Sequence, residues 1–132
     1  MTLKTVEEFK KKPRTFDTIL SISSFEHDGL GRYGDPLDPY GDLRAMKSCL
    51  NMLKPGGKLI LSVPVGSGCL VWNIHRIYGA YRLSKLLNDW RLVDYRGAYQ
   101  SMFSLPEGNY YEEPVFLLEP DNFLRDRASE LE

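Results

Sequence analysis

Two short apolar segments separated by an amphipathic helix place the strongest constraint on how this chain can fold. Residues 16–23 and 58–63 are rich in β-branched and other apolar side chains, so both are predicted to be strands. Their apolar runs are nearly continuous, which is typical of strands covered on both faces, so Leu20 and Ile22 are expected to be buried. A helix between two strands lets them pair in parallel. We therefore expect the two strands to be adjacent, parallel and central in one sheet.

The connecting helix carries its own start and stop signals. Asp38 is a favourable N-cap residue, and Pro39 suits the first helical position. The Lys-Pro-Gly-Gly run at residues 54–57 is expected to end the helix and turn the chain into the second strand. Between these signals, five apolar residues recur at helical spacing and predict one buried face: Leu43, Met46, Cys49, Leu50 and Leu53.

The rest of the chain predicts a single α/β domain spanning residues 1–132. The expected order is strand, helix, strand, helix, strand, strand, the pattern of a sheet whose parallel pairs are joined by crossovers. Residues 64–74 are expected to form a loop, and Trp72 and Trp90 are expected to be core or lid residues. The remaining predicted elements are helices at residues 6–12 and 77–87 and strands at residues 90–95 and 114–119.

The composition is typical of a globular protein with a packed core. Hydrophobic residues make up 42% of the 132 residues, enough for a packed core. A net charge of -1 argues against nucleic acid or a membrane surface as the main partner. No long apolar run is present, so a soluble, cytoplasmic protein is expected. The two cysteines, Cys49 and Cys69, lack the spacing of a disulfide framework or zinc site, and residues 1–14 and 121–132 are expected to be frayed.

Several segments resemble known methyltransferases. Residues 16–21, the following helix and residues 53–64 are similar to the fourth strand, its helix and the fifth strand of class I S-adenosylmethionine-dependent methyltransferases. Residues 24–42, Val63-Pro64-Val65-Gly66 and His75-Arg76-Ile77-Tyr78 resemble the signature of an uncharacterised methyltransferase-like family. That family is a domain of unknown function with bacterial and nematode members. The resemblance covers roughly residues 15–95.

The resemblance implies a partial Rossmann-like sheet that corresponds to the second half of that fold. Such a sheet is mostly parallel, although its last strand can be antiparallel. Ligands of open α/β sheets bind at the carboxyl ends of the strands, where residues 23–41 and 64–74 would lie. The resemblance also implies S-adenosylmethionine as cofactor, with Ser23 and Ser24 as the cofactor-side candidates.

The usual anchors of that cofactor are not evident in the sequence. A glycine-rich turn after the first strand and an acidic residue after the second would hold it, and residues 1–14 are too short for those two units. We therefore expect this chain alone to bind S-adenosylmethionine weakly or not at all. A shortened paralogue, a fragment, and a half that pairs with another chain along an exposed sheet edge all remain open.

Glu26 and His27 are the candidate catalytic residues. They follow a strand directly, so their side chains can reach the ligand edge, and an imidazole titrates near neutral pH and can act as a general base. Alternatively, both side chains only pin the loop by hydrogen bonds. Some O-methyltransferases carry a third, carboxylate ligand for a divalent metal where this chain has Ser23. Two ligands make a weak site, so no metal is expected.

The candidate substrate-binding residues are Arg32, Tyr33, His75 and Arg76. Arg32 is expected to bridge the loop carboxylates Asp28, Asp35 and Asp38, with substrate contact as the other interpretation. His75 and Arg76 would either bind an anionic substrate group or form hydrogen bonds at a helix start. Two functions stay open: methyl transfer to the hydroxyl of a small molecule or glycan, and a non-catalytic interaction module.

Overall fold

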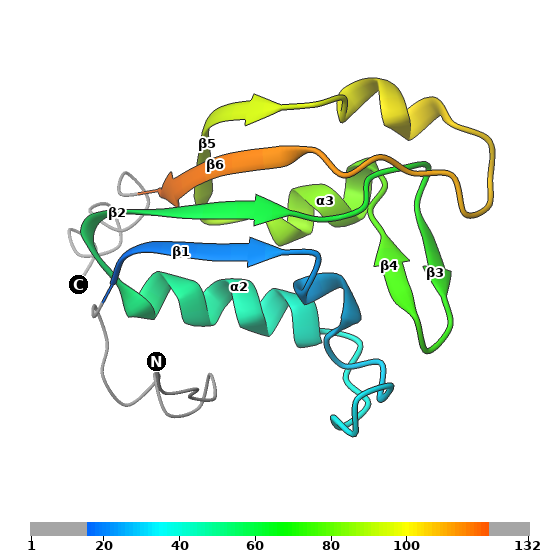
Figure 1. The fold of residues 1–132 in the computed structure, drawn as a ribbon, viewed down its shortest axis with the longest axis horizontal. Helices are drawn as coiled ribbons and strands as arrows, with labels where there is room; N and C mark the ends of the chain where they lie inside the picture. Colours follow the sequence, from blue (N-terminus) through cyan, green and yellow to red (C-terminus); the bar gives the residue numbers. More distant parts are fainter. Residues whose placement is uncertain (1–15, 122–132) are drawn as a thin grey trace, which may run out of the picture.

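A computed structural model describes residues 16–121 and contains a four-stranded sheet. The strands are β1 (Phe16–Ile22), β2 (Leu53–Ser62), β5 (Trp90–Arg96) and β6 (Val115–Pro120), in the order β1-β2-β6-β5 (Figure 1). β1 pairs with β2 in parallel, which confirms the expected adjacent, parallel pair. β1 is an edge strand within residues 16–121, so the expectation that both strands are central is wrong for β1. β6 is antiparallel to both of its neighbours.

The expectation of a mostly parallel sheet is wrong, because two of its three pairings are antiparallel. The chain leaves β5 at the edge where β1 and β2 also end, and it returns as β6 without crossing back (Figure 1). A strand that starts at that edge must run in the opposite direction. β6 then lies between β2 and β5, so the predicted antiparallel last strand is present and determines most of the pairing.

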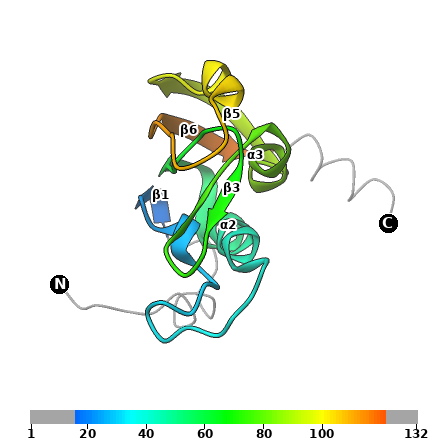
Figure 2. The same ribbon diagram turned by 90° about the vertical axis from the view of Figure 1, so that its right-hand side faces the viewer.

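Two helices cover one face of the sheet (Figure 2). They are α2 (Gly41–Met52) and α3 (Ala80–Leu86), whose apolar sides join the inward side chains of β2 and β6 in one core. Cys49 is buried in this core, as its place on the helix predicted. Alternate residues of the strands and both helices contribute many of the buried apolar side chains: Met46, Cys49, Leu59, Leu61, Leu83, Leu86, Phe116 and Leu118.

The opposite face of the sheet is open in the described part of the chain. Leu20 is 67% exposed and Ile22 is 55% exposed, so the prediction that both are buried is wrong. They pair with Ile60 and Ser62 of β2 and point away from the face that α2 and α3 cover. The nearly continuous apolar run in β1 therefore has helical cover on one face only.

The helices begin later than the sequence predicted. Asp38 does not cap α2; its carboxylate accepts a hydrogen bond from the Tyr40 amide at 2.9 Å and forms a turn ahead of Gly41. The second helix begins at Ala80 because Ile77 belongs to a strand. None of the helices in residues 16–121 is long and apolar enough to cross a lipid bilayer. The predicted helix at residues 6–12 lies outside the described residues, as do residues 1–14 and most of 121–132.

The predicted loop at residues 64–74 contains the first strand and the turn of an antiparallel hairpin. Its strands are β3 (Cys69–Val71) and β4 (His75–Ile77), and Asn73 takes a left-handed conformation, φ 60°, in the turn. Two 3-10 turns also lie outside the predicted elements: η1 (Phe25–His27) and η2 (Gln100–Ser104). The hairpin and η1 stand together at the carboxyl edge of β1 and β2 (Figure 1).

Candidate functional site

The end of β1 turns sharply and delivers η1 to the carboxyl edge of the sheet. The Ser23 amide donates to the Ser62 carbonyl at 2.9 Å and continues the pairing with β2. Ser23 itself is left-handed, φ 51°, which is uncommon for a residue with a side chain. Because the chain reverses there, Glu26 and His27 lie beside the hairpin, as expected of residues at this edge.

Glu26 is a fully buried carboxyl group with unequal oxygens. Its Oε1 accepts a hydrogen bond from Ser23 Oγ at 2.8 Å and lies 3.6 Å from Nε2 of His27. Its Oε2 is buried and has no hydrogen-bond partner among the described residues. A buried oxygen without a partner is destabilising, so this atom marks a place where a water or ligand donor would be stabilising.

The geometry of His27 determines its neutral tautomer. Nδ1 lies 2.5 Å from the Ile74 carbonyl oxygen, which can only accept, so Nδ1 carries the proton. Nε2 then holds the basic lone pair, next to Glu26. The ring stacks on His75 with centroids 6.1 Å apart and planes at 16°, and it meets Tyr33 edge-on at 6.0 Å. The hydrogen bond therefore pins the loop to the hairpin and also leaves one ring nitrogen available as a base.

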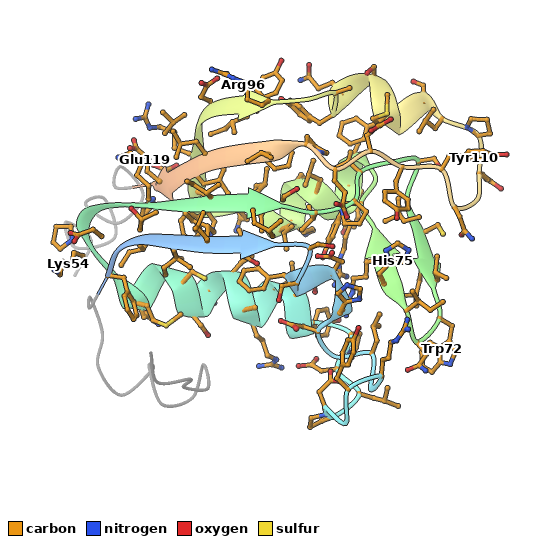
Figure 3. The ribbon with its side chains drawn as sticks, in the orientation of Figure 1. Lys54, Trp72, His75, Arg96, Tyr110 and Glu119 are labelled. Atoms are coloured by element: carbon orange, nitrogen blue, oxygen red, sulfur yellow. The ribbon has the colours of Figure 1, made fainter. Side chains whose placement is uncertain are left out.

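Residues from the segment before β6 complete the cluster. Glu113 accepts a hydrogen bond from Ser23 Oγ at 3.3 Å, and Tyr111 meets the His75 ring edge-on at 5.3 Å (Figure 3 shows His75). Burial lowers the pKa of His75, and the nearby charge of His27 lowers it further. Neither Glu113 nor Tyr111 was predicted from the sequence to belong to the site. We call the group at this edge the carboxyl-edge cluster: Ser23, Glu26, His27, His75, Tyr111 and Glu113.

Arg76 is bound to backbone carbonyls of the loop. Its side chain is 8% exposed, and it donates to the carbonyls of Asp28 at 2.6 Å and Asp38 at 3.3 Å. Its Nε also lies 3.8 Å from the buried carboxylate of Asp42. Arg76 lies in β4 rather than at a helix start, so it fastens the hairpin to the loop.

The expectation that Arg32 bridges the loop carboxylates is wrong. Arg32 is exposed, forms no ion pair within residues 16–121, and its guanidinium lies 5.8 Å from the ring of Tyr33. Asp35 instead accepts the Gly29 amide at 2.7 Å, and Asp38 pairs with Arg44 at 2.8 Å. The Gly29 amide lowers the pKa of Asp35, whereas the Tyr40 amide, followed by Arg44, lowers the pKa of Asp38.

Gly29 allows the backbone of this loop to approach Asp38 closely. Gly29, Gly31 and Gly34 have the Gly-x-Gly-x-x-Gly spacing of a dinucleotide-binding turn, a spacing that sequence analysis did not single out. Such a turn must join a strand directly to a helix, yet η1 precedes Gly29 and α2 starts only at Gly41. A side chain at Gly29 would overlap the Asp38 carbonyl oxygen. The motif therefore closes the loop on itself.

The described residues fit S-adenosylmethionine poorly. Ser23 and Ser24 are exposed at the end of β1, but the Ser23 hydroxyl already donates to Glu26 and Glu113. The glycine-rich segment is not at a helix start, so it offers no row of free amides to a ligand. No group of three His, Cys, Asp or Glu side chains in residues 16–121 is arranged to hold a metal ion.

Comparison with known families places the chain in one of them. A family described as "Caenorhabditis protein of unknown function, DUF268" matches residues 1–116, most of the 132-residue chain. The chain belongs to the DUF268 family. This confirms an uncharacterised domain family with nematode members, as the resemblance of residues 24–42 implied. No curated protein matches this DUF268 chain.

Proposed function

We propose that this DUF268 chain supplies the acceptor side of an S-adenosylmethionine-dependent methyl transfer to the hydroxyl of a small molecule or glycan. The observation that carries the proposal is the position of the His27 ring between the Ile74 carbonyl and Glu26. Its Nδ1–H is held by the Ile74 carbonyl, and its basic Nε2 lies 3.6 Å from the buried Glu26 carboxyl. The Ile74 carbonyl orients the imidazole, and the Glu26 carboxylate can stabilise the positive charge that the ring gains. This arrangement suits a general base that removes a hydroxyl proton.

In this proposal His27 takes the hydroxyl proton of the acceptor on Nε2 as the oxygen becomes a nucleophile. The resulting imidazolium is stabilised by Glu26, and the Ile74 carbonyl keeps the ring from rotating. Side-chain proton transfer of this kind contributes about 10²–10⁴-fold to a rate. Glu26 and His27 are thereby assigned as catalytic residues, with Tyr33 and His75 beside the His27 ring as acceptor contacts.

The fold supports the methyltransferase assignment. The resemblance implied a parallel strand pair joined by a helix and a last strand free to run in reverse, and β1, α2, β2 and β6 have this arrangement. Since residues 16–121 fit the cofactor poorly, the proposal assigns them the proton transfer alone. The methyl donor would then be bound only weakly by this chain alone.

Transfer of isotope-labelled methyl groups tests the proposal. The chain is incubated with millimolar S-adenosylmethionine, to offset weak binding, and a panel of monosaccharides and oligosaccharides. We expect label transfer that His27→Gln slows by about 10²–10⁴-fold and Glu26→Gln slows less. Asp17→Asn, at the start of β1 with a side chain that is 85% exposed, should leave the rate unchanged. Equal rates for the wild type and His27→Gln would contradict the proposal.

A non-catalytic interaction module is the second candidate, favoured by the engaged Ser23 hydroxyl and the exposed apolar face at Leu20 and Ile22. Such a face is typical of surfaces that other chains cover. If this candidate is correct, no acceptor of the panel becomes labelled. Instead, Leu20→Lys would disrupt an assembly that the wild-type chain forms, as measured by sedimentation velocity.

A further inference from the structure

A cleft of about 510 Å³ lies between the loop after η1 and the β3–β4 hairpin. Its volume lies within the range of roughly 300–1,000 Å³ that is usual for small-molecule sites. Its walls are mostly apolar, and they come from the loop, the hairpin and Arg82 of α3. Loop and hairpin contribute its large apolar side chains: Leu30, Leu37, Leu70, Trp72 and Ile77.

The rim of the cleft exposes apolar side chains to an unusual degree. Leu37 is 66% exposed, Leu70 is 52% exposed and Trp72 is 65% exposed. Trp72 was expected to be a core or lid residue, and the structure places it at the outer end of the hairpin (Figure 3). Single exposed apolar residues are ordinary on a protein surface. Three that line one cleft are typical of a surface that binds a ligand or another chain.

The charged residues in the walls are already engaged. Arg82 donates to the Pro39 carbonyl at 2.6 Å and to Asp42 at 2.7 Å. Arg76 donates to backbone carbonyls of the loop, and Asp38 is paired with Arg44. The cleft therefore offers neither a free cation to an anionic ligand nor a free carboxylate to a cationic one.

The same bonds keep the cleft open. Arg76 joins the hairpin to the loop on one side, and Arg82 joins α3 to the loop on the other. Gly29 brings the two arms of the loop into backbone contact, since a side chain there would overlap the Asp38 carbonyl oxygen. A site built this way needs little ordering when a ligand binds, which favours affinity.

We propose that this cleft binds a neutral, apolar small molecule through an aromatic or alkyl group that packs against Trp72 and Leu37. The inference does not depend on methyl transfer. None of the residues of the carboxyl-edge cluster lines the cleft. Binding here and proton transfer at His27 can therefore fail independently.

Two fluorescent probes of matched shape and different charge test the proposal. The neutral probe is N-phenyl-1-naphthylamine, and the anionic probe is 1-anilinonaphthalene-8-sulfonate. We expect saturable binding of the neutral probe with one site per chain, and binding of the anionic probe weaker by about tenfold or more. The two cleft variants, Trp72→Ala and Leu37→Ser, should each lower the affinity for the neutral probe by about tenfold.

Tyr81→Ala is the matched control, because Tyr81 is 76% exposed and does not line the cleft. It should leave the affinity of the neutral probe unchanged, and circular dichroism should show all three variants folded. Three results would overturn the proposal: the anionic probe binds as tightly as the neutral one, Tyr81→Ala weakens binding as much as Trp72→Ala, or no saturable binding occurs. A dimer that Trp72→Ala dissociates would also overturn it, because a second copy would then fill the cleft.

Discussion

The ring of His27 is fastened to the hairpin by a hydrogen bond of 2.5 Å from Nδ1 to the carbonyl oxygen of Ile74. This single contact links the turn after β1 to the turn of the β3–β4 hairpin. It also determines which ring nitrogen is basic, since a carbonyl accepts and never donates. The position of the loop and the chemistry assigned to His27 therefore depend on the same bond.

The first prediction concerns the cofactor. Because Ser23 already donates to two carboxyl groups and the glycine-rich loop lies apart from any helix start, the purified chain should bind S-adenosylmethionine weakly or not at all. Calorimetric titration with S-adenosylmethionine and S-adenosylhomocysteine measures this. A clear titration with a low-micromolar dissociation constant would show that residues of the isolated chain complete the cofactor site.

The second prediction separates the two arginines of the loop region. Arg76→Ala removes the donor to the part-buried carbonyls of Asp28 and Asp38 and one of the cations beside Asp42, so it should lower the free energy of unfolding by about 2–4 kcal/mol. Arg32→Ala should change it by less than about 0.5 kcal/mol, because Arg32 is exposed. Urea denaturation of both variants checks this. An Arg32→Ala effect as large as that of Arg76→Ala would contradict the structure of the loop.

These two arginines also show which contacts local sequence spacing can predict and which it cannot. Arg32 lies close to three aspartates along the chain, whereas Arg76 reaches the loop only because the hairpin folds back onto η1. Local spacing predicted the β1–β2 pair and the buried face of α2, since periodicity is a local property. It did not predict that β6 lies between β2 and β5, because strand order depends on contacts between distant segments.

The same reasoning applies to the candidate site. Glu26 and His27 could be placed at the carboxyl edge of the sheet because they closely follow a strand. Glu113 and Tyr111 gave no local signal, and they join the cluster because β6 starts where β2 ends. The exposure of Leu20 was equally unpredictable, since an apolar run does not reveal how many of its faces are covered.

The third prediction compares two glycines with similar backbone conformations. Gly29 has φ +82° and Gly34 has φ +81°, so alanine is strained at both by about 1–2 kcal/mol. Only at Gly29 would the added carbon overlap another atom, the Asp38 carbonyl oxygen. Gly29→Ala should therefore lower the melting temperature clearly more than Gly34→Ala, as measured by differential scanning calorimetry. Equal effects would mean that the two arms of the loop are not in contact.

The fourth prediction is a pH dependence that arises from Asp28. Burial, followed by the charge of Asp35, raises the pKa of Asp28 from 3.8 to about 6. At a pH between these two pKa values, Asp28 keeps its proton in the folded state and releases it in the unfolded state. The free energy of unfolding therefore falls as the pH rises from about 4 to about 6. Asp28→Asn should remove that loss.

Solvent screening reduces the effect because Asp28 is partly exposed, so we expect Asp28→Asn to stabilise the protein by about 1 kcal/mol at pH 7. Urea denaturation at several pH values measures the difference. Asp17→Asn is the control, since the Asp17 side chain is 85% exposed and its variant should run parallel to the wild type. A pH profile of Asp28→Asn that also runs parallel to the wild type would refute this assignment.

The proposed role of His27 is tested most directly by the protonation of its ring. We predict that neutral His27 carries its proton on Nδ1, because Nδ1 lies against the Ile74 carbonyl oxygen, which can only accept a hydrogen bond. In free histidine this tautomer is the less common one. Long-range nitrogen–proton correlation spectra of ¹⁵N-labelled protein distinguish the two ring nitrogens by their chemical shifts. A protonated Nδ1 and an unprotonated Nε2 would support His27 as the base beside Glu26. A neutral His27 with its proton on Nε2 would leave no basic nitrogen there and would contradict the account.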